Sequence, residues 1–438
     1  MRDLRLPCFV VAVSFSCSPA MMPNTCPAST GAGTMHGASL SMAETWTASG
    51  SPHVLPFDTS ISAAITLEPC AVVTLAADKT VTVNAGGSII ANGTATQPVV
   101  IKNADGAQKW ASIRLIGGTA RFSYTTLENG GAPLNTVVDL TGTLDVRSAN
   151  AATLTAPDPV LFVDHLTVKG SGSQGVRLQN GGGFSADSRS LTIAGSAGHA
   201  VTSDANLVGT LPAGNYRGNA QDDILLMDNP GIGWDMTLKE RGVPYLSGGI
   251  NQAGVTSVGA VGNGTVAVLI IEPGVRWKFK KGTGNLSVDP GGTPSRGVLV
   301  ARGTTEKPIV FTSADASPAA GDWLGIWLGG DDASNALDHV RVEFAGKLQS
   351  SGSNSCQSVM NGTTANGGAV RVYHLPRVGL VTNSVFVDSA TNAIDRGWRD
   401  DSKPSFLAGN TFTRIAQCKE TLPRDTSGAC PMPLPPCP

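Results

Sequence analysis

The chain has 438 residues, and 15% of them are charged, with a formal net charge of −2. This length is enough to bury a large core, while the near balance of charge, without a basic stripe, excludes an electrostatic reason to bind nucleic acid. Gly occurs 53 times and aromatic residues make up only 5% of the chain. Because long stretches of Glu, Lys, Leu and Ala at helical spacing are also missing, the composition predicts an all-β protein of short strands and turns.

The first residues predict an export signal. Arg2 and Arg5 give a positive start, the apolar run CFVVAVSF follows, and Cys17 comes after a small Ser. This order is typical of a leader, here residues 1–17, in which Cys17 would be the lipidation site. The alternative is a misplaced start codon in front of a cytosolic protein. No later window has about 18 consecutive apolar residues, so the sequence predicts no membrane-spanning helix.

Cysteine usage favours the export hypothesis. Beyond Cys17 six cysteines remain, and an even number in an exported chain suggests disulfides, although six allow fifteen pairings. Zinc is the competing interpretation, but the sequence has no C-x2-C pair and no His at ligand spacing from a Cys. The candidate disulfide residues are Cys26, Cys70, Cys356, Cys418, Cys430 and Cys437.

Short alternating segments recur along the first half of the chain, separated by clusters of Gly, Asn or Asp. Such evenly spaced strands indicate a β solenoid, in which one coil cannot bury its apolar face alone and stacks on the next. The predicted strands lie at KTVTVNA (79–85), QPVVIKN (97–103), ASIRLIG (111–117), TVVDLTG (136–142), LTVKGSG (166–172) and LTIAGSA (191–197).

A long unit of this pattern is duplicated. Trp46 and Trp234 precede the two copies, and the phrase LEPCAVVTLAAD (67–78) returns as IEPGVRWKFKKG (271–282), with Cys70 in the place of Gly274. Three further pairs follow in the same order: 89–101 with 298–311, 110–118 with 323–330, and 124–131 with 340–347. The expected organisation is a flexible linker (18–44), two halves (45–232 and 233–417), and a Pro- and Cys-rich tail (418–438).

The second copy carries a resemblance to a known family. The string from IEPGVRWKF through GVLVARGTTEKPIVFTSAD and GDWLGIWLGG to VRVEFAG resembles the exported right-handed parallel β-helix proteins of Gram-negative bacteria. These proteins are pectate-lyase-like in fold, often carry lipoprotein signals, and mostly lack an assigned activity. The resemblance covers 265–346 best and weakens towards 60–131. It implies one continuous β-helix, all-β and right-handed, with an irregular cysteine-containing C-terminal tail.

Comparison of the two copies predicts which side chains point inward. Alternate residues of a strand face opposite sides, and Val275, Trp277 and Phe279 match Ala71, Val73 and Leu75, all apolar. These six are expected in the interior, while the intervening residues, Arg276, Lys278 and Lys280 among them, should face water. The same argument places Leu324, Ile326 and Leu328 inside.

Outward residues of the following strands are candidate ligand contacts. If Leu324, Ile326 and Leu328 point inward, then Trp323 and Trp327 point outward, as does Trp110 in the first copy, where their rings would be able to stack on sugars. Trp398, in the charged segment DRGWRDDSK (395–403), is a further carbohydrate-binding candidate. The alternative is that loops cover these rings.

Acidic pairs are candidate metal ligands. Asp331 and Asp332 follow the second Trp strand, and in a loop they would be able to share a calcium ion, although surface solvation explains them as well. No other cofactor is expected. The sequence lacks the full set of polygalacturonase motifs, because His199 precedes Asp222 and Asp223 and neither NTD nor RIK occurs. A single sequence therefore supplies no catalytic residue.

Three functional hypotheses remain. The first is a non-enzymatic exported protein, lipid-anchored if Cys17 is modified, with a scaffold, adhesion or binding role at the outer membrane, cell surface or periplasm, or in the medium. The second is a polysaccharide lyase or glycoside hydrolase on the same fold. The third is a carbohydrate-binding module that uses the outward Trp residues. Polysaccharide or other cell-surface components are the expected partners.

Overall fold

The structure is a computed structural model. Within residues 1–438 it describes 23–29, 31–104, 108–133, 141–150, 154–228, 230–248, 252–259, 266–289, 296–348, 355–356, 359–360, 363–364, 367–376, 379–433 and 436–437. The leader 1–17, with the lipidation candidate Cys17, lies outside these residues.

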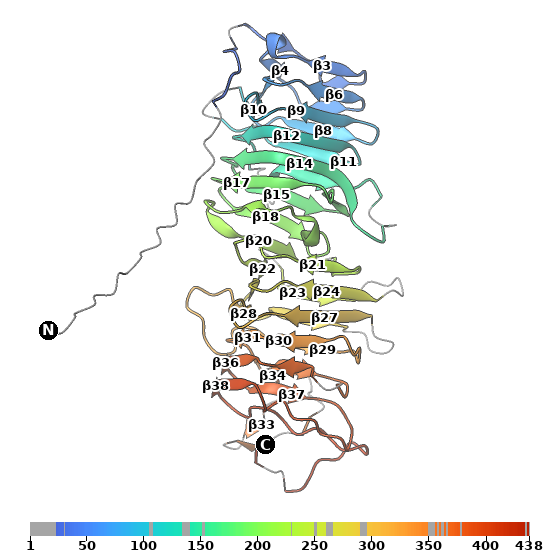
Figure 1. The fold of residues 1–438 in the computed structure, drawn as a ribbon, viewed down its shortest axis with the longest axis vertical. Helices are drawn as coiled ribbons and strands as arrows, with labels where there is room; N and C mark the ends of the chain where they lie inside the picture. The colour runs from blue at the N-terminus through green and yellow to red at the C-terminus, as the bar shows by residue number, and fades with distance from the viewer. Residues whose placement is uncertain are drawn as a thin grey trace, which may run out of the picture.

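The protein is an elongated stack of short strands, with the N-terminal strands at one end and the C-terminal strands at the other (Figure 1). The helical segments in the described ranges are two single 3₁₀ turns, η1 (Ala48–Gly50) and η3 (Val208–Thr210). Every pairing between named strands is parallel except that of β32 (Val359–Met360) with β33 (Thr363–Thr364). An all-β protein built from parallel sheets is therefore confirmed.

Two long sheets run along the stack. The 14-stranded sheet consists of β2 (Ser39–Leu40), β5 (Thr59–Ile61), β8 (Thr80–Asn84), β11 (Ser112–Ile116), β13 (Gly142–Arg147), β15 (Gln174–Gln179), β18 (His199–Asp204), β20 (Gln221–Met227), β22 (Tyr245–Ser247), β25 (Arg276–Phe279), β28 (Ile309–Ser313), β31 (Val340–Glu343), β36 (Val385–Ser389) and β38 (Thr411–Ile415). The 12-stranded sheet consists of β1 (Thr34–Met35), β3 (Glu44–Trp46), β4 (His53–Leu55), β6 (Ala64–Leu67), β7 (Val72–Leu75), β9 (Ser88–Asn92), β10 (Val99–Asn103), β12 (Thr119–Glu128), β14 (Asp158–Lys169), β16 (Gly182–Phe184), β17 (Arg189–Ala194) and β19 (Gly214–Asn215).

Two five-stranded sheets complete the second half. The β21 sheet consists of β21 (Met236–Leu238), β24 (Ala267–Ile271), β27 (Gly297–Arg302), β30 (Ala336–Asp338) and β35 (Val381–Thr382). The β23 sheet consists of β23 (Val255–Val258), β26 (Asn285–Val288), β29 (Gly325–Leu328), β34 (Gly368–Val372) and β37 (Asn392–Arg396).

Chain order shows how the sheets are built. In most of the stack a strand pairs with the third strand along the chain, as β5 does with β8 and β8 with β11, so the chain leaves a sheet, visits others and returns one layer further on. Each of the long strands β12 and β14 spans a corner where the backbone bends, at Tyr124 (φ 40°) and His165 (φ 60°). This winding is consistent with a β-helix.

Most strands predicted in the first half have counterparts in the structure. The segments at 79–85, 97–103, 111–117 and 191–197 contain β8, β10, β11 and most of β17, and 166–172 begins within β14. Of the segment 136–142, residues 136–140 lie outside the described residues.

One apolar core fills the stack from Leu40 to Phe406. The predicted interior residues of the two copies, Ala71, Val73, Leu75, Val275, Trp277 and Phe279, are all at most 2% exposed. The facing prediction is confirmed for these six, and Arg276 is exposed while Lys278 and Lys280 are partly buried. One outward residue of the first copy, Thr74, is nevertheless covered.

The duplicated phrases adopt the same turn. The amide of Ala71 donates to the carbonyl of Glu68, and the amide of Val275 donates to that of Glu272. Cys70 has φ 68° and Gly274 has φ 90°, so both occupy a left-handed position that favours Gly. The copies lie in different sheets, however, because β7 belongs to the 12-stranded sheet and β25 to the 14-stranded one. The second copy is thus displaced around the long axis by one sheet.

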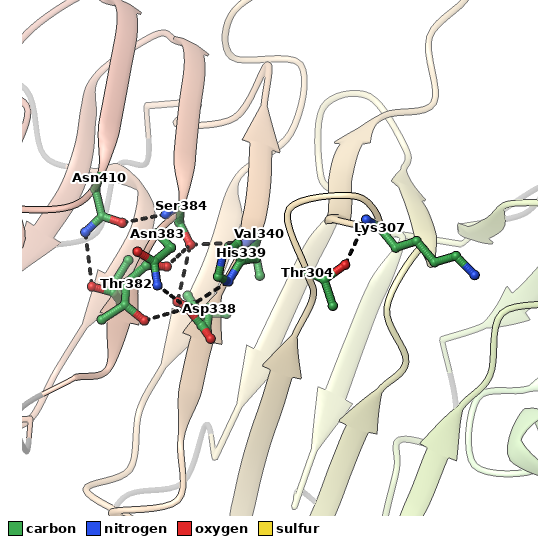
Figure 2. A network of polar contacts seen from close by, with 11 residues as sticks. Thr304, Lys307, Asp338, His339, Val340, Thr382, Asn383, Ser384 and Asn410 are labelled. Atoms are coloured by element: carbon green, nitrogen blue, oxygen red, sulfur yellow. Dashed lines mark hydrogen bonds and ion pairs between the residues drawn. The ribbon is translucent and has the colours of Figure 1, made fainter.

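Polar side chains connect successive layers at one corner of the second half, shown in Figure 2. Asn383 and Thr382 donate hydrogen bonds to one carboxylate oxygen of Asp338, at 2.9 and 2.8 Å. Burial alone would raise the pKa of Asp338, but these bonds hold it below the ordinary value. Asn410 accepts from the amide of Ser384 at 2.7 Å. Each Asn therefore links its own layer to a neighbouring one, as a stack of turns requires.

Gly303, in the turn before this corner, has no room for a side chain. A Cβ there would lie 2.5 Å from the carbonyl oxygen of His339, and a Cβ at Gly93, in the first copy, would lie 2.4 Å from that of Tyr124. Since backbone cannot move aside without shifting a strand, we expect Gly303→Ala to cost about 1–3 kcal/mol of unfolding free energy. Urea unfolding measures the cost. Gly37→Ala, where nothing lies within 4 Å, is the control, and equal midpoints for the two variants would contradict the close approach.

Asp204 makes stability depend on pH. Burial raises the pKa of this carboxyl from 3.8 to about 6, although the amide of Asn180 donates to it at 2.8 Å. Because the folded pKa is raised, the contribution of Asp204 is most favourable below pH 4 and is lost as the pH rises from about 4 to about 6. We expect Asp204→Asn to stabilise the protein by up to about 3 kcal/mol at pH 7 and by little at pH 4. Thermal unfolding at both pH values tests this, and an equal gain at both would contradict it.

Both ends of the stack are joined to irregular segments by disulfides. Cys26 is bonded to Cys70 at the N-terminal end, and at the C-terminal end Cys356 is bonded to Cys430 and Cys418 to Cys437. All six candidate cysteines are therefore paired, as predicted. β1 and β2 already pair with β4 and β5, so the region expected to be a linker (18–44) contributes strands to the first layer.

The tail packs on the last layers of the stack. Cys356 forms an isolated bridge with Leu422, as does Ile394 with Glu420, and Glu420 is 1% exposed. In the ranges that the structure describes, no helix is long and apolar enough to span a membrane.

Candidate binding groove

A groove runs across the ends of three neighbouring strands of the β23 sheet. β29, β34 and β37 pair in register through Leu328, Val372 and Arg396. Because parallel strands all end at the same edge, the residues that follow them meet there. The groove holds about 460 Å³ and is lined by Asp331, Tyr373, His374, Leu375, Gly397, Trp398 and Arg399. We call it the strand-end groove.

Each charged residue of the strand-end groove comes from a different strand end. Asp331 follows β29 and is exposed, His374 follows β34 and is partly buried, and Arg399 follows β37 and is exposed. Backbone hydrogen bonds hold the strand ends together. The amide of Tyr373 donates to the carbonyl of Leu328 at 3.0 Å, and the amide of Gly397 donates to the carbonyl of Val372 at 2.8 Å. The groove thus combines a carboxylate, an imidazole and a guanidinium on a rigid edge.

One predicted aromatic contact lies beside this groove. Trp327 points outward from β29, as predicted, and its ring stacks on Tyr373 with centroids 4.9 Å apart. The guanidinium of Arg371 lies 5.4 Å from the Trp327 ring, and Asp395 is 3.4 Å from that guanidinium. Tyr373 therefore covers one face of the ring that was expected to meet a sugar.

The expected outward orientation of Trp323 and Trp110 is wrong. Both side chains have zero exposure. Alternation does not extend to them, because β29 begins only at Gly325 and β11 only at Ser112, so each Trp precedes its strand by two residues. Trp323 stacks on Phe279 with centroids 4.3 Å apart, while Leu324, expected inside, is partly exposed.

The two buried Trp residues make the same contact in both copies. The indole nitrogen of Trp110 donates to the carbonyl of Glu128, and that of Trp323 donates to the carbonyl of Glu343, both at 2.8 Å. These rings fill the core and satisfy a carbonyl of the next layer. They are structural residues and offer no ring face to a ligand.

Trp398 is also buried, at 2% exposure. Its ring meets Phe406 edge to face, with centroids 6.2 Å apart, and its nitrogen donates to the carbonyl of Ser402 at 3.3 Å. Trp398 lies at the base of the strand-end groove, but its ring closes the end of the core. Trp398 was a candidate for stacking on a sugar, and that expectation is wrong because its ring is buried.

Asp331 and Asp332 lie side by side in a turn at the rim of the groove. One carboxylate oxygen of Asp332 accepts a hydrogen bond from the amide of Ser334 at 2.8 Å. Asp332 therefore has a structural role, because this bond stabilises the turn. Within the described residues, no group of three or more His, Cys, Asp or Glu side chains is placed to hold a metal ion. A calcium ion takes six to eight oxygen ligands, so two carboxylates alone do not make a calcium site.

Of the seven lining residues, sequence analysis named two as candidates, Asp331 and Trp398, and missed five: Tyr373, His374, Leu375, Gly397 and Arg399. Their signal is positional, since each follows the end of a strand, but the sequence does not show which strand ends are neighbours. A second cluster was also unforeseen: the imidazole of His199 contacts the carboxylate of Asp223. That pair is formed between β18 and β20.

The chemistry of the strand-end groove is that of a polar binding site. Arg399 and His374 suit an anionic or hydroxyl-rich ligand, and Asp331 accepts hydroxyl donors. No protein-family model, curated protein or solved structure matches this chain.

Proposed function

We propose that this chain is an exported, right-handed parallel β-helix that serves as a non-enzymatic scaffold and binding protein of the cell envelope. The observation that carries the proposal is the set of three disulfides that close both ends of the strand stack. Disulfides of this kind persist in oxidising compartments and are rare in the cytosol. The leader-like residues 1–17 agree with the same location.

The handedness follows from a general rule about parallel strands. A strand that leaves a sheet and returns to it as a parallel neighbour does so by a right-handed connection in about 98% of cases. The pairing of most strands with the third strand along the chain supports a single continuous coil. A rigid rod with one core presents its exposed edges and turns to partners, which suits a scaffold.

Export and disulfide pairing are tested together on the protein made from its full reading frame. Cell fractionation is expected to recover protein that begins at or near Cys17 from the envelope fraction. Mass spectrometry without reduction is expected to find the three linked peptide pairs. A Cys17→Ala variant distinguishes lipid anchoring from plain secretion. Recovery of intact Met1 with free thiols from the cytosol would refute the proposal.

Processing of an acidic polysaccharide is a second candidate function. The strand-end groove favours it, because Asp331, His374 and Arg399 line one site. Incubation with polygalacturonate and alginate, with and without calcium, would release unsaturated uronate products if the protein were a lyase. Ultraviolet absorbance and reducing-end assays would detect lyase and hydrolase activity respectively, and Arg399→Ala should abolish either.

A further inference from the structure

A second groove lies where the two halves of the stack meet. It holds about 470 Å³ and is lined by Pro157, by residues around η3, by residues 234–237 with Lys239, and by two residues of β24. Gly209 of η3 approaches the start of β21 closely, since a Cβ on it would lie 3.2 Å from that of Met236. We call this the junction groove.

An anchored aromatic ring forms part of the wall. Trp234 is partly buried, and its indole nitrogen donates to the backbone carbonyl of Asn206 at 2.8 Å. Val268 and Ile270 continue the wall on β24, and Ile270 is 44% exposed. The ring is thus fixed in orientation beside an apolar surface that water covers at a free-energy cost.

The duplication explains why this aromatic ring remains accessible. Trp46 pairs with Leu67, and the equivalent of Leu67 in the second copy, Ile271, pairs with Leu238. By register, the counterpart of Trp46 in the second copy is therefore Leu238. Trp234 lies four residues before Leu238, in the connection that precedes β21. Trp46, by contrast, is 4% exposed.

A buried polar atom of the junction groove lacks a partner. Asn206 is 6% exposed, and its side-chain oxygen accepts no hydrogen bond in the described structure. A buried acceptor without a donor costs about 1–3 kcal/mol. Because this oxygen is covered in the structure, the Asn206 side chain must turn toward the groove before a ligand hydroxyl can donate to it and recover that cost. Thr210 adds a hydroxyl to the same lining.

The charges at the groove balance. Of the described lining residues, Lys239 is the cation and Asp235 the anion, and Asp235 also accepts from the amide of Val268 at 2.9 Å. A ligand with net charge gains little from such a pair, whereas hydroxyl groups can donate to Asp235 and Asn206 and accept from Lys239. The apolar wall in turn suits the C–H face of a pyranose ring.

We propose that the junction groove binds a neutral oligosaccharide, with one pyranose ring against Trp234 and Ile270 and a hydroxyl donating to the side-chain oxygen of Asn206. This inference rests on the proposed function, because it names the ligand class of an exported binding protein. It assigns the site to the junction of the halves, separate from the strand-end groove.

Isothermal titration of the purified, disulfide-bonded protein tests the assignment. The probes are cellohexaose, xylohexaose and maltohexaose, with hexagalacturonate as the charged counterpart. At least one neutral probe is expected to bind, and hexagalacturonate is expected to bind more weakly. Ile270→Glu places a charge on the exposed wall and should lower the affinity by about tenfold or more.

Val266→Glu is the matched control, because Val266 is 45% exposed, lies just before β24 and does not line the groove. Circular dichroism of both variants should match that of the parent. Absence of binding by all three neutral probes, tighter binding of hexagalacturonate, or equal loss in both variants would overturn the inference. Those outcomes leave the fractionation and disulfide results unaffected, so failure of the ligand assignment is distinguishable from failure of the proposed function.

Discussion

Trp323→Ala is expected to lower the free energy of unfolding by about 3–5 kcal/mol. The side chain has zero exposure, stacks on Phe279 and donates to the carbonyl of Glu343, so truncation opens a cavity and leaves that carbonyl without its donor. Urea unfolding followed by circular dichroism gives the cost. Trp110→Ala should behave in the same way, because the first copy repeats the contact.

Trp327→Ala is the matched control for this experiment. Trp327 points outward from the same strand region, and among the described contacts its truncation removes the stacking on Tyr373 and the contact with Arg371. We expect a cost of about 1 kcal/mol, in the range of an aromatic pair. Should Trp323→Ala unfold at the same urea concentration as the parent, the inward orientation of Trp323 would be wrong and its candidacy as a ligand contact would return.

Glu420→Gln is expected to cost about 3–5 kcal/mol, as does removal of one partner from other buried ion pairs. The side chains of Arg396 and Glu420 are 3% and 1% exposed, with a guanidinium nitrogen 3.2 Å from a carboxylate oxygen. The other carboxylate oxygen accepts from the amide of Phe406 at 2.8 Å. Burial lowers the pKa of Arg396, and the neighbouring Glu420 carboxylate opposes that shift.

Hydrogen exchange localises the effect of Glu420→Gln. Amides of β37 and of residues 418–424 should lose protection, while those of β5 and β8 should keep it, because repeat stacks lose stability locally. Asp388→Asn is the control, since Asp388 pairs with Arg414, which is 65% exposed, and exposed pairs contribute about 0–1 kcal/mol. The double variant Arg396→Met with Glu420→Met should regain most of the loss. Equal protection in all variants would show that the tail does not cap the stack.

The comparison of the two copies predicted correctly which side chains of the strands face the core. It failed for residues that lie just before a strand. Val275, Trp277 and Phe279 lie within or next to a strand, where a period of two holds. Trp323 precedes its strand, and the positive φ of Gly325 (122°) marks the break in alternation. Side chains alternate between the two faces only where the backbone is extended. The alternating pattern therefore could not predict which way a side chain points in a turn.

Contacts between distant segments were the least predictable part. The sequence identified the six candidate cysteines but left their pairing open. It gave no sign that Glu420 would pair with Arg396 or that Asp331 and Arg399 would share a groove. Those neighbours depend on which layers stack, and the displacement of the second copy by one sheet is invisible in the alignment of the halves.

The central claim, that successive layers stack in one parallel register, is tested most directly by oxidative cross-linking on the β21 sheet. Ile270 and Val300 are register partners on adjacent strands, whereas Thr237 and Val300 are two strands apart. Adjacent strands lie about 4.8 Å apart, and a disulfide spans Cα atoms up to about 7 Å apart. The account predicts a linked peptide for Ile270→Cys with Val300→Cys and none for Thr237→Cys with Val300→Cys. Cross-linking of the second pair without the first would contradict the register on which the fold and both grooves depend.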